Sequence, residues 1–201
     1  MDDGFNGQIV KVATETKRCV FFSMQLWLWS AFNLNLINQF ISRKDVKMRG
    51  ISFEIKNEYS RYILDILTNL ISATWHWSIG PGESYKIENG TLGANLFPDD
   101  TILNGLSFLN CISVDEYYVI FADLKAFPQR EDVVEIKSYE DFLKSSCEMV
   151  LLIIDSSYVS LFVKEESIID KLFERATASY YTNIQLITDE NDTRSCLTVW
   201  G

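Results

Sequence analysis

The chain has 201 residues, of which 47% are hydrophobic and 13% aromatic, which suffices for the core of one domain and excludes an intrinsically disordered chain. The formal net charge is −10, but residues 1–47 hold six Lys/Arg against four Asp/Glu, while residues 48–201 hold 12 against 24. An acidic body repels phosphate groups, so we expect no binding to nucleic acid or anionic membranes, and basic protein partners are favoured.

The first 47 residues differ from the rest of the chain. Their apolar segment, 19–41, is interrupted by five Asn or Gln residues, so no membrane span is predicted, and no signal-peptide cleavage site follows it. The string RKDVKM can be back-translated to place a purine-rich AAAGGA sequence shortly before the ATG of Met48. We therefore expect residues 1–47 to be an extension, either upstream DNA read in frame or a disordered segment, and Met48 to be the native start.

The domain is predicted to open with a strand and a helix. Alternating apolar and polar residues predict a half-buried strand at 49–55. Asn57 is predicted to cap an amphipathic helix over 58–71, in which Tyr59 and Tyr62 share the apolar spacing.

Two strands are predicted next, at 74–79 and 83–87. The second strand ends in Asn89-Gly90, a pair typical of a tight hairpin turn. Residues 91–113 show no regular pattern except for a short helix around 101–111.

The middle of the chain contains the clearest predicted strand, at 116–127, and a shorter one at 132–136. Ser138 has the side chain of a helix cap, and Asp141 lies in the first turn that follows it, so a short helix is predicted over 138–145.

The last part alternates strands with one helix. Residues 148–155 are apolar apart from the first and last positions, which predicts a central strand buried on both faces, and 158–164 should return as a hairpin. An amphipathic helix over 165–180 is followed by strands at 183–188 and 197–200. This order predicts a single α+β domain over residues 48–201, with a mainly antiparallel sheet and two or three helices packed on it.

The cysteines and the only histidine give no catalytic pattern. The chain has four cysteines, at Cys19, Cys111, Cys147 and Cys196, without a C-x-x-C spacing. From Met48 onward their number is odd, which favours reduced thiols and a cytoplasmic location. His76 lies between two tryptophans on a predicted strand and is expected to be structural or to lie on the surface.

One arrangement of charged residues is that of metal-dependent nucleases. Glu135 and Lys137 form an EIK triplet on a predicted strand, with Asp123 upstream. In such enzymes two carboxylates hold Mg²⁺ and a lysine orients the attacking water. The same triplet occurs at 54–56, and chance alone gives about one in a chain of this composition. A metal-dependent hydrolase or nuclease that uses Asp123, Glu135 and Lys137 is therefore the alternative function.

Acidic residues are the candidates for a partner-binding surface, although solubility explains any one such cluster more often. The candidate pairs are Asp99-Asp100, Glu131-Asp132 and Glu165-Glu166. A further acidic loop, TDENDTR at 188–194, lacks the glycine and the final glutamate of an EF-hand loop. It is predicted to be a solvated turn in which Arg194 is the counter-ion.

Five strings appear in order along the chain: MRGISFEIKNEY, LGANLFPDD, EYYVIFADLKAFP, LLIIDSSYVSLFVK and ITDENDTR. Together they resemble a small family of Bacillus-type bacteria that is catalogued only as a domain of unknown function. The resemblance covers roughly residues 48–200. It implies that members begin at the position of Met48, and it implies no catalytic residue.

These observations favour a cytoplasmic, non-enzymatic module that binds a partner, such as an immunity or antitoxin-like protein. Acidic surfaces accelerate the capture of basic proteins such as nucleases, so a basic protein is the expected partner. No cofactor and no metal are expected for this function.

Overall fold

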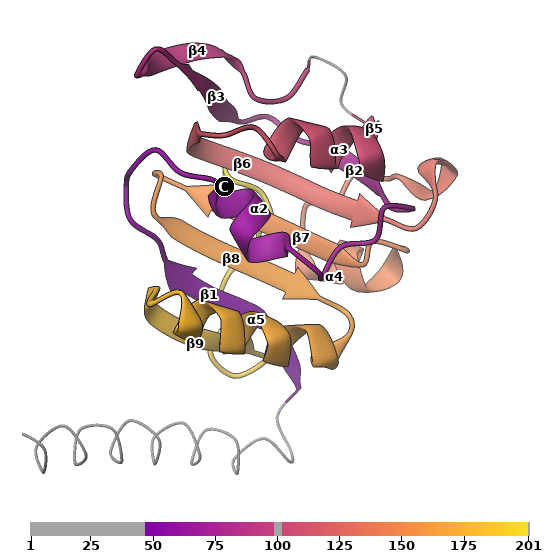
Figure 1. Cartoon of the computed structure of the whole chain (residues 1–201). Helices are drawn as coiled ribbons and strands as arrows, with labels where there is room; N and C mark the ends of the chain where they lie inside the picture. Colours follow the sequence, from indigo (N-terminus) through magenta and orange to yellow (C-terminus); the bar gives the residue numbers. More distant parts are fainter. Residues whose placement is uncertain (1–46, 99–101, 201) are drawn as a thin grey trace, which may run out of the picture. The chain divides into compact units, whose positions relative to one another are not determined.

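Antiparallel strands dominate the structure, a computed structural model that describes residues 47–98 and 102–200. The strands are β1 (Met48–Glu54), β2 (His76–Ile79), β3 (Glu83–Glu88), β4 (Thr91–Asn95), β5 (Ile102–Asn104), β6 (Tyr117–Phe127), β7 (Met149–Ile154), β8 (Tyr158–Val163) and β9 (Thr182–Thr188). They form one sheet in the order β4-β3-β6-β7-β8-β1-β9, and β2 pairs with β6 and β5 outside this path (Figure 1). The predicted antiparallel sheet is confirmed.

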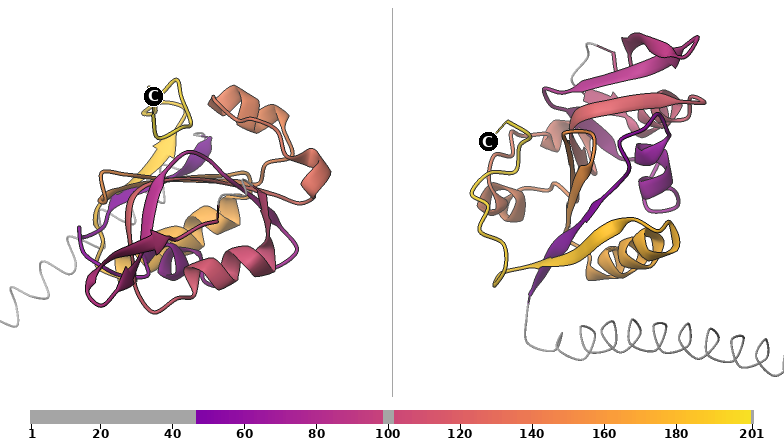
Figure 2. Two further views of the ribbon diagram at one scale, coloured as in Figure 1. Left: turned by 90° about the horizontal axis from the view of Figure 1, so that it is seen from above. Right: turned by 90° about the vertical axis from the view of Figure 1, so that its left-hand side faces the viewer.

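Helices cover both faces of this sheet. The described residues contain α2 (Tyr62–Leu67), α3 (Gly105–Ile112), α4 (Tyr139–Lys144), α5 (Glu166–Ala178) and a 3-10 turn, η2 (Arg130–Asp132). Helices α2, α3 and α5 lie on one face, while α4 and the C-terminal segment lie on the other (Figure 2). The part of the chain described thus has four α-helices, where two or three were predicted. None of these helices is long and apolar enough to cross a bilayer.

The core has two layers because strand residues alternate between the faces of the sheet. In β7, Val150 and Leu152 pack with Phe142 of α4 on one face. The residues between and beside them are buried as well, so both faces of this strand are covered. On the opposite face, the rings of Trp77 and Phe108 stack with centroids 4.1 Å apart and join β2 to α3. The prediction of a central strand buried on both faces is therefore confirmed.

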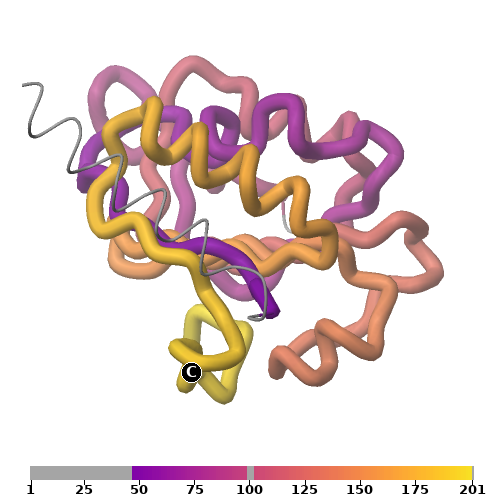
Figure 3. Tube along the Cα trace, turned by 90° about the horizontal axis from the view of Figure 1, so that it is seen from below, coloured from indigo at the N-terminus to yellow at the C-terminus, as the bar shows by residue number. Residues whose placement is uncertain are grey.

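Strand β1 lies between two strands from the far end of the domain. It pairs with β8 on one side and β9 on the other, and Figure 3 shows its indigo tube beside the yellow strand. Gly50 approaches β8 so closely that a Cβ atom there would lie 1.8 Å from the carbonyl oxygen of Leu161. Only glycine fits this contact without moving the backbone.

Hairpins and the cap of α4 follow the predicted pattern. Asn89 and Gly90 both have positive φ, as the tight β3–β4 turn requires. The Ser138 side chain accepts a hydrogen bond from the Asp141 backbone N–H, and the Asp141 carboxylate accepts one from Ser138. These bonds hold the pKa of Asp141 below its usual value. The predicted helix start is therefore confirmed.

The predicted helix over 58–71 was too long. Ser60 forms a backbone bridge with Tyr117 at the start of β6, and this long-range pairing holds the chain extended until α2 begins at Tyr62. Asn57 does not cap the helix, because its side-chain oxygen accepts a hydrogen bond from the Tyr118 hydroxyl at 2.7 Å.

Three other predictions differ from the structure. Residues 132–136 form no strand, since η2 ends at Asp132 and irregular chain follows. Residues 197–200 form no strand either, although Leu197 and Val199 are buried against α4 and the sheet. Residues 91–113 are more regular than predicted, because β4, β5 and α3 lie there. The predicted extension, residues 1–47, lies outside the described residues apart from Lys47.

Candidate functional site: a tyrosine-lined cleft

A cleft of about 600 Å³ opens where the end of β1 meets the end of α5. We call it the tyrosine cleft, because Tyr62, Tyr180 and Tyr181 form its aromatic walls. Carboxylates line it as well, on Glu54, Glu58 and Asp65, and its cations are Lys56 and Arg175. Tyrosine is enriched in protein interfaces, where its ring supplies apolar area and its hydroxyl supplies a hydrogen bond.

One wall of the tyrosine cleft is held rigidly by aromatic packing. Tyr181 stacks on Phe53 with ring centroids 5.0 Å apart and meets the edge of Tyr62 at 6.0 Å. The Tyr62 hydroxyl donates a hydrogen bond of 2.9 Å to a carboxylate oxygen of Glu58. Burial and this bond raise the pKa of Tyr62 to about 12, so the hydroxyl stays protonated. Two rings and one carboxylate thus keep fixed positions.

The second wall carries Tyr180, the most exposed large hydrophobic side chain among the described residues. It follows the end of α5, with φ of 56° in the left-handed region and 89% of its surface exposed. Its backbone N–H bonds the carbonyl of Thr177, and that of Tyr181 bonds Ala176, the pattern of a Schellman motif. Glycine is the usual residue at this position, since a Cβ is disfavoured there by about 1 kcal/mol. A tyrosine therefore stands, exposed and strained, where the fold alone favours glycine.

The charges in the tyrosine cleft favour a cationic partner group. Arg175 is engaged by the fold, since its guanidinium donates to the carbonyl of Ile66 at 2.8 Å. Glu58 and Lys56 are exposed, and Glu54 is half-buried. The lining of the cleft therefore contains three carboxylates and two cations, and one of these cations, Arg175, already donates a hydrogen bond to a backbone carbonyl of α2.

The predicted acidic pairs lie elsewhere. Glu131 and Asp132 are exposed on η2, beyond the opposite end of β6 from the Ser60 bridge, a strand of about 35 Å. Glu165 and Glu166 are exposed at the start of α5, while the cleft lies at its end, about 20 Å away. The pair at positions 99 and 100 lies outside the described residues. Neither the pair on η2 nor the pair on α5 lines the tyrosine cleft.

The residues of the alternative function divide into two pairs. Asp123 is buried on β6 and forms an ion pair with Lys125, two positions along the same face. Burial raises the pKa of Asp123, although Lys125 and the backbone of Val199 act in the opposite direction. Glu135 and Lys137 are exposed and pair with each other at 3.1 Å. Within residues 47–98 and 102–200, no three His, Cys, Asp or Glu side chains are grouped closely enough to hold a metal ion.

Asp123 also lines a second cleft, of about 340 Å³, at the bend between β2 and β3. Gly80 packs directly on the Asp123 side chain, since a Cβ there would lie 2.9 Å from its carboxyl carbon. At this bend, the ring of Trp200 packs at a tilt against Phe121 with centroids 4.6 Å apart, and its N–H donates a hydrogen bond to the carbonyl of Pro81. The C-terminal segment thus covers part of the sheet face that carries the buried ion pair.

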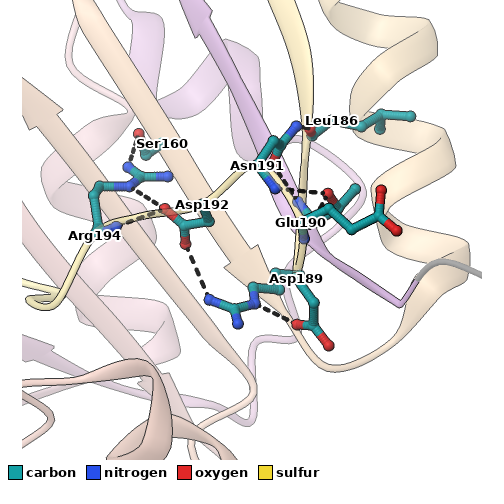
Figure 4. Close-up of polar contacts among 9 residues, drawn as sticks. Ser160, Leu186, Asp189, Glu190, Asn191, Asp192 and Arg194 are labelled. Atoms are coloured by element: carbon teal, nitrogen blue, oxygen red, sulfur yellow. Dashed lines mark hydrogen bonds and ion pairs between the residues drawn. The ribbon is translucent and has the colours of Figure 1, made fainter.

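The acidic loop after β9 is a structural lock (Figure 4). Asp192 is only 3% exposed, bonds Arg194 at 2.9 Å and lies 3.4 Å from Arg49. Arg194 in turn bonds Ser160 of β8 at 2.7 Å. Arg194 is the internal counter-ion, as predicted, but the prediction of a solvated turn was wrong for Asp192, because two arginines cover it.

His76 and the described cysteines add no second site. His76 is half-buried on β2, and its Nδ1 atom has no hydrogen-bond partner in the described residues. Cys111, Cys147 and Cys196 are free thiols. Burial raises the pKa of Cys147 to about 12, which keeps it protonated and unreactive.

The fold and the cleft together define an acidic, antiparallel α+β domain with an open, tyrosine-lined cleft. The chain belongs to the family described as protein of unknown function (DUF2691), whose sequence profile matches residues 48–198. It is similar to the uncharacterized protein YncE of Bacillus subtilis (strain 168), with 44% identity over 152 residues, which cover 75% of this chain and 99% of that protein. No solved structure matches significantly. The resemblance to a small bacterial family is therefore confirmed.

Proposed function

We propose that the domain is a non-enzymatic binding protein of the cytoplasm, of the immunity or antitoxin kind, which captures a basic protein through the tyrosine cleft. The observation that carries this proposal is Tyr180, an exposed aromatic residue in a backbone conformation that favours glycine. Strained residues that a fold does not need for its own stability mark functional sites. The neighbouring carboxylates give the cleft its preference for cations, and the free thiols agree with a reducing compartment.

A photoreactive phenylalanine analogue at position 180, incorporated in the host cell, tests this proposal. We expect one discrete adduct with a basic protein, and no such adduct from the same analogue at Leu106, which is 64% exposed on α3 and outside the cleft. Binding of that partner should weaken at least tenfold when Glu54 and Glu58 are both replaced by glutamine, and more so at low salt. Equal adducts from both positions, or an acidic partner, would contradict the proposal.

Tyr180→Gly should separate stability from binding. Glycine relieves the left-handed strain, so we expect the free energy of unfolding in urea to rise by about 1 kcal/mol. Partner affinity, measured by calorimetry, should fall at least tenfold, because an exposed aromatic anchor is lost. Tyr180→Ala is the matched control: it removes the ring but keeps a Cβ, so binding should weaken without the gain in stability. Unchanged affinity in both variants would exclude Tyr180 from the interface.

A further inference from the structure

The outer edge of β9 continues directly from the tyrosine cleft. Strand β9 is the last strand of the sheet, and in the described part of the chain it pairs only with β1. Its first residue, Thr182, also lines the cleft. Edge strands present unpaired backbone groups to which another extended chain can bind.

Asn191 identifies which backbone groups of β9 point outward. Its side-chain amide donates to the carbonyl of Leu186 at 2.8 Å and accepts from the N–H of Thr188 at 2.8 Å. These groups therefore point away from β1. Gln185 and Ile187 pair with Ser52 and Gly50 of β1, whereas Ile184 lies where the register of the two strands shifts and has no partner residue in β1.

Within the described part of the chain, the rest of this edge lacks the usual protection of an edge strand. Proteins guard edge strands with charged residues, prolines or covering elements. The sequence of β9, TNIQLIT, contains no charged residue and no proline. Asn191 covers only the end remote from the cleft, so among the described residues the segment at Ile184 and the N–H of Leu186 stay uncovered on the outer side. The open part of the edge is the part next to the cleft.

Carboxylates flank this open edge at both ends. Glu54 and Glu58 lie at the cleft end, and Glu190 is exposed just beyond the other end. An uncharged edge between two acidic ends is complementary to an extended segment with an apolar or polar centre and cationic side chains toward its ends.

We propose that the partner binds by strand addition: an extended segment rich in lysine or arginine pairs with the edge of β9 at Ile184–Leu186 and places a cationic side chain in the tyrosine cleft. This inference rests on the proposed function and specifies the chemistry of its partner. Backbone hydrogen bonds supply affinity in this mode, and alternate side chains of the added strand supply specificity.

A matched pair of variants tests strand addition. Ile184→Pro and Ile184→Ala both remove the isoleucine side chain, but only proline removes the backbone N–H, and Ile184 has no partner residue in the β1 ladder. The probe is a synthetic nine-residue peptide of alternating lysine and valine, titrated into the full chain and followed by NMR. We expect the peptide to protect the amide hydrogens of Ile184 and Leu186 from exchange and to bind Ile184→Pro at least tenfold more weakly than Ile184→Ala.

Asn191→Ala gives a test of opposite sign that does not depend on the folding of the proline variant. It frees the Leu186 carbonyl and the Thr188 N–H, so the open edge lengthens and the peptide should bind several-fold more tightly. Equal affinity for Ile184→Pro and Ile184→Ala, or no gain in Asn191→Ala, would overturn strand addition. So would self-association of the chain that Ile184→Pro abolishes, because the edge would then take a second copy.

The same titration separates this inference from the proposed function. If the glutamine variant at Glu54 and Glu58 loses binding while Ile184→Pro does not, the cleft binds cations without strand addition. If Ile184→Pro loses binding of the peptide while the glutamine variant keeps it, strand addition at the edge of β9 is supported and the proposed role of the tyrosine cleft is overturned.

Discussion

Lys125→Met is expected to lower the free energy of unfolding by about 3–5 kcal/mol at pH 7, because it leaves a buried carboxyl without its cation. The side chains of Asp123 and Lys125 are only 3% and 9% exposed, and each is the other's ion-pair partner. Urea unfolding monitored by circular dichroism measures the loss.

The size of this loss should depend on pH. Burial already raises the pKa of Asp123 in the intact pair, and removal of Lys125 takes away the largest opposing effect. In the unfolded chain the carboxyl ionises near pH 4, while in the folded variant it keeps its proton to higher pH. The free energy of unfolding of Lys125→Met should therefore fall by about 1.4 kcal/mol per pH unit above pH 4, until the raised pKa is passed.

A double substitution is the control for this prediction. Asp123→Val combined with Lys125→Met removes both charges and should recover most of the loss, because a buried ion pair and an apolar pair of similar size stabilise a fold about equally. A single variant as stable as the double variant, with no dependence on pH, would contradict the assignment of a buried, mutually dependent pair.

Asp192→Asn is expected to cost about 2–3 kcal/mol, the second-largest effect. Asparagine keeps the size of the side chain but removes the negative charge between Arg49 and Arg194, which hold β1 and the C-terminal segment (Figure 4). Leu197 follows Arg194 in the C-terminal segment, and its N–H donates a hydrogen bond of 2.6 Å to the Lys137 carbonyl. Its hydrogen exchange should accelerate more than that of the sheet amides.

Asp189→Asn is the matched control. Asp189 bonds the same Arg49 at 2.5 Å but is 47% exposed, so water screens the pair and the expected loss is below about 1 kcal/mol. Equal losses in the two variants would mean that burial of Asp192 does not matter, which contradicts the structure.

Local patterns predicted the parts of the fold that depend on nearby residues. The Ser138 cap, the Asn89-Gly90 turn and the apolar run of β7 each express a preference that operates within a few positions, and all three are confirmed. The start of α2 was predicted wrongly because its determinant, the bridge from Ser60 to Tyr117, joins positions 57 residues apart.

The tyrosine cleft could not be predicted from the sequence for the same reason. Its residues come from 54–68 and 175–182, and only the β1–β9 pairing brings these segments together. Helical spacing placed Tyr59 with the core residues, but the structure leaves it 41% exposed, before the helix starts. One local signal was available: the adjacent Tyr180 and Tyr181 end an amphipathic helix at a position where glycine is usual.

The position of β1 between β8 and β9 has a consequence for synthesis of the chain. Its first partner begins at Tyr158, more than 100 residues after β1 ends. At a translation rate of about 5–20 residues per second, Ile51 and Phe53 wait on the order of ten seconds outside the ribosome before their strand can pair. During that interval the emerging chain exposes an unpaired apolar strand, so we expect this domain to need chaperones that hold nascent chains more than a fold built from local hairpins does.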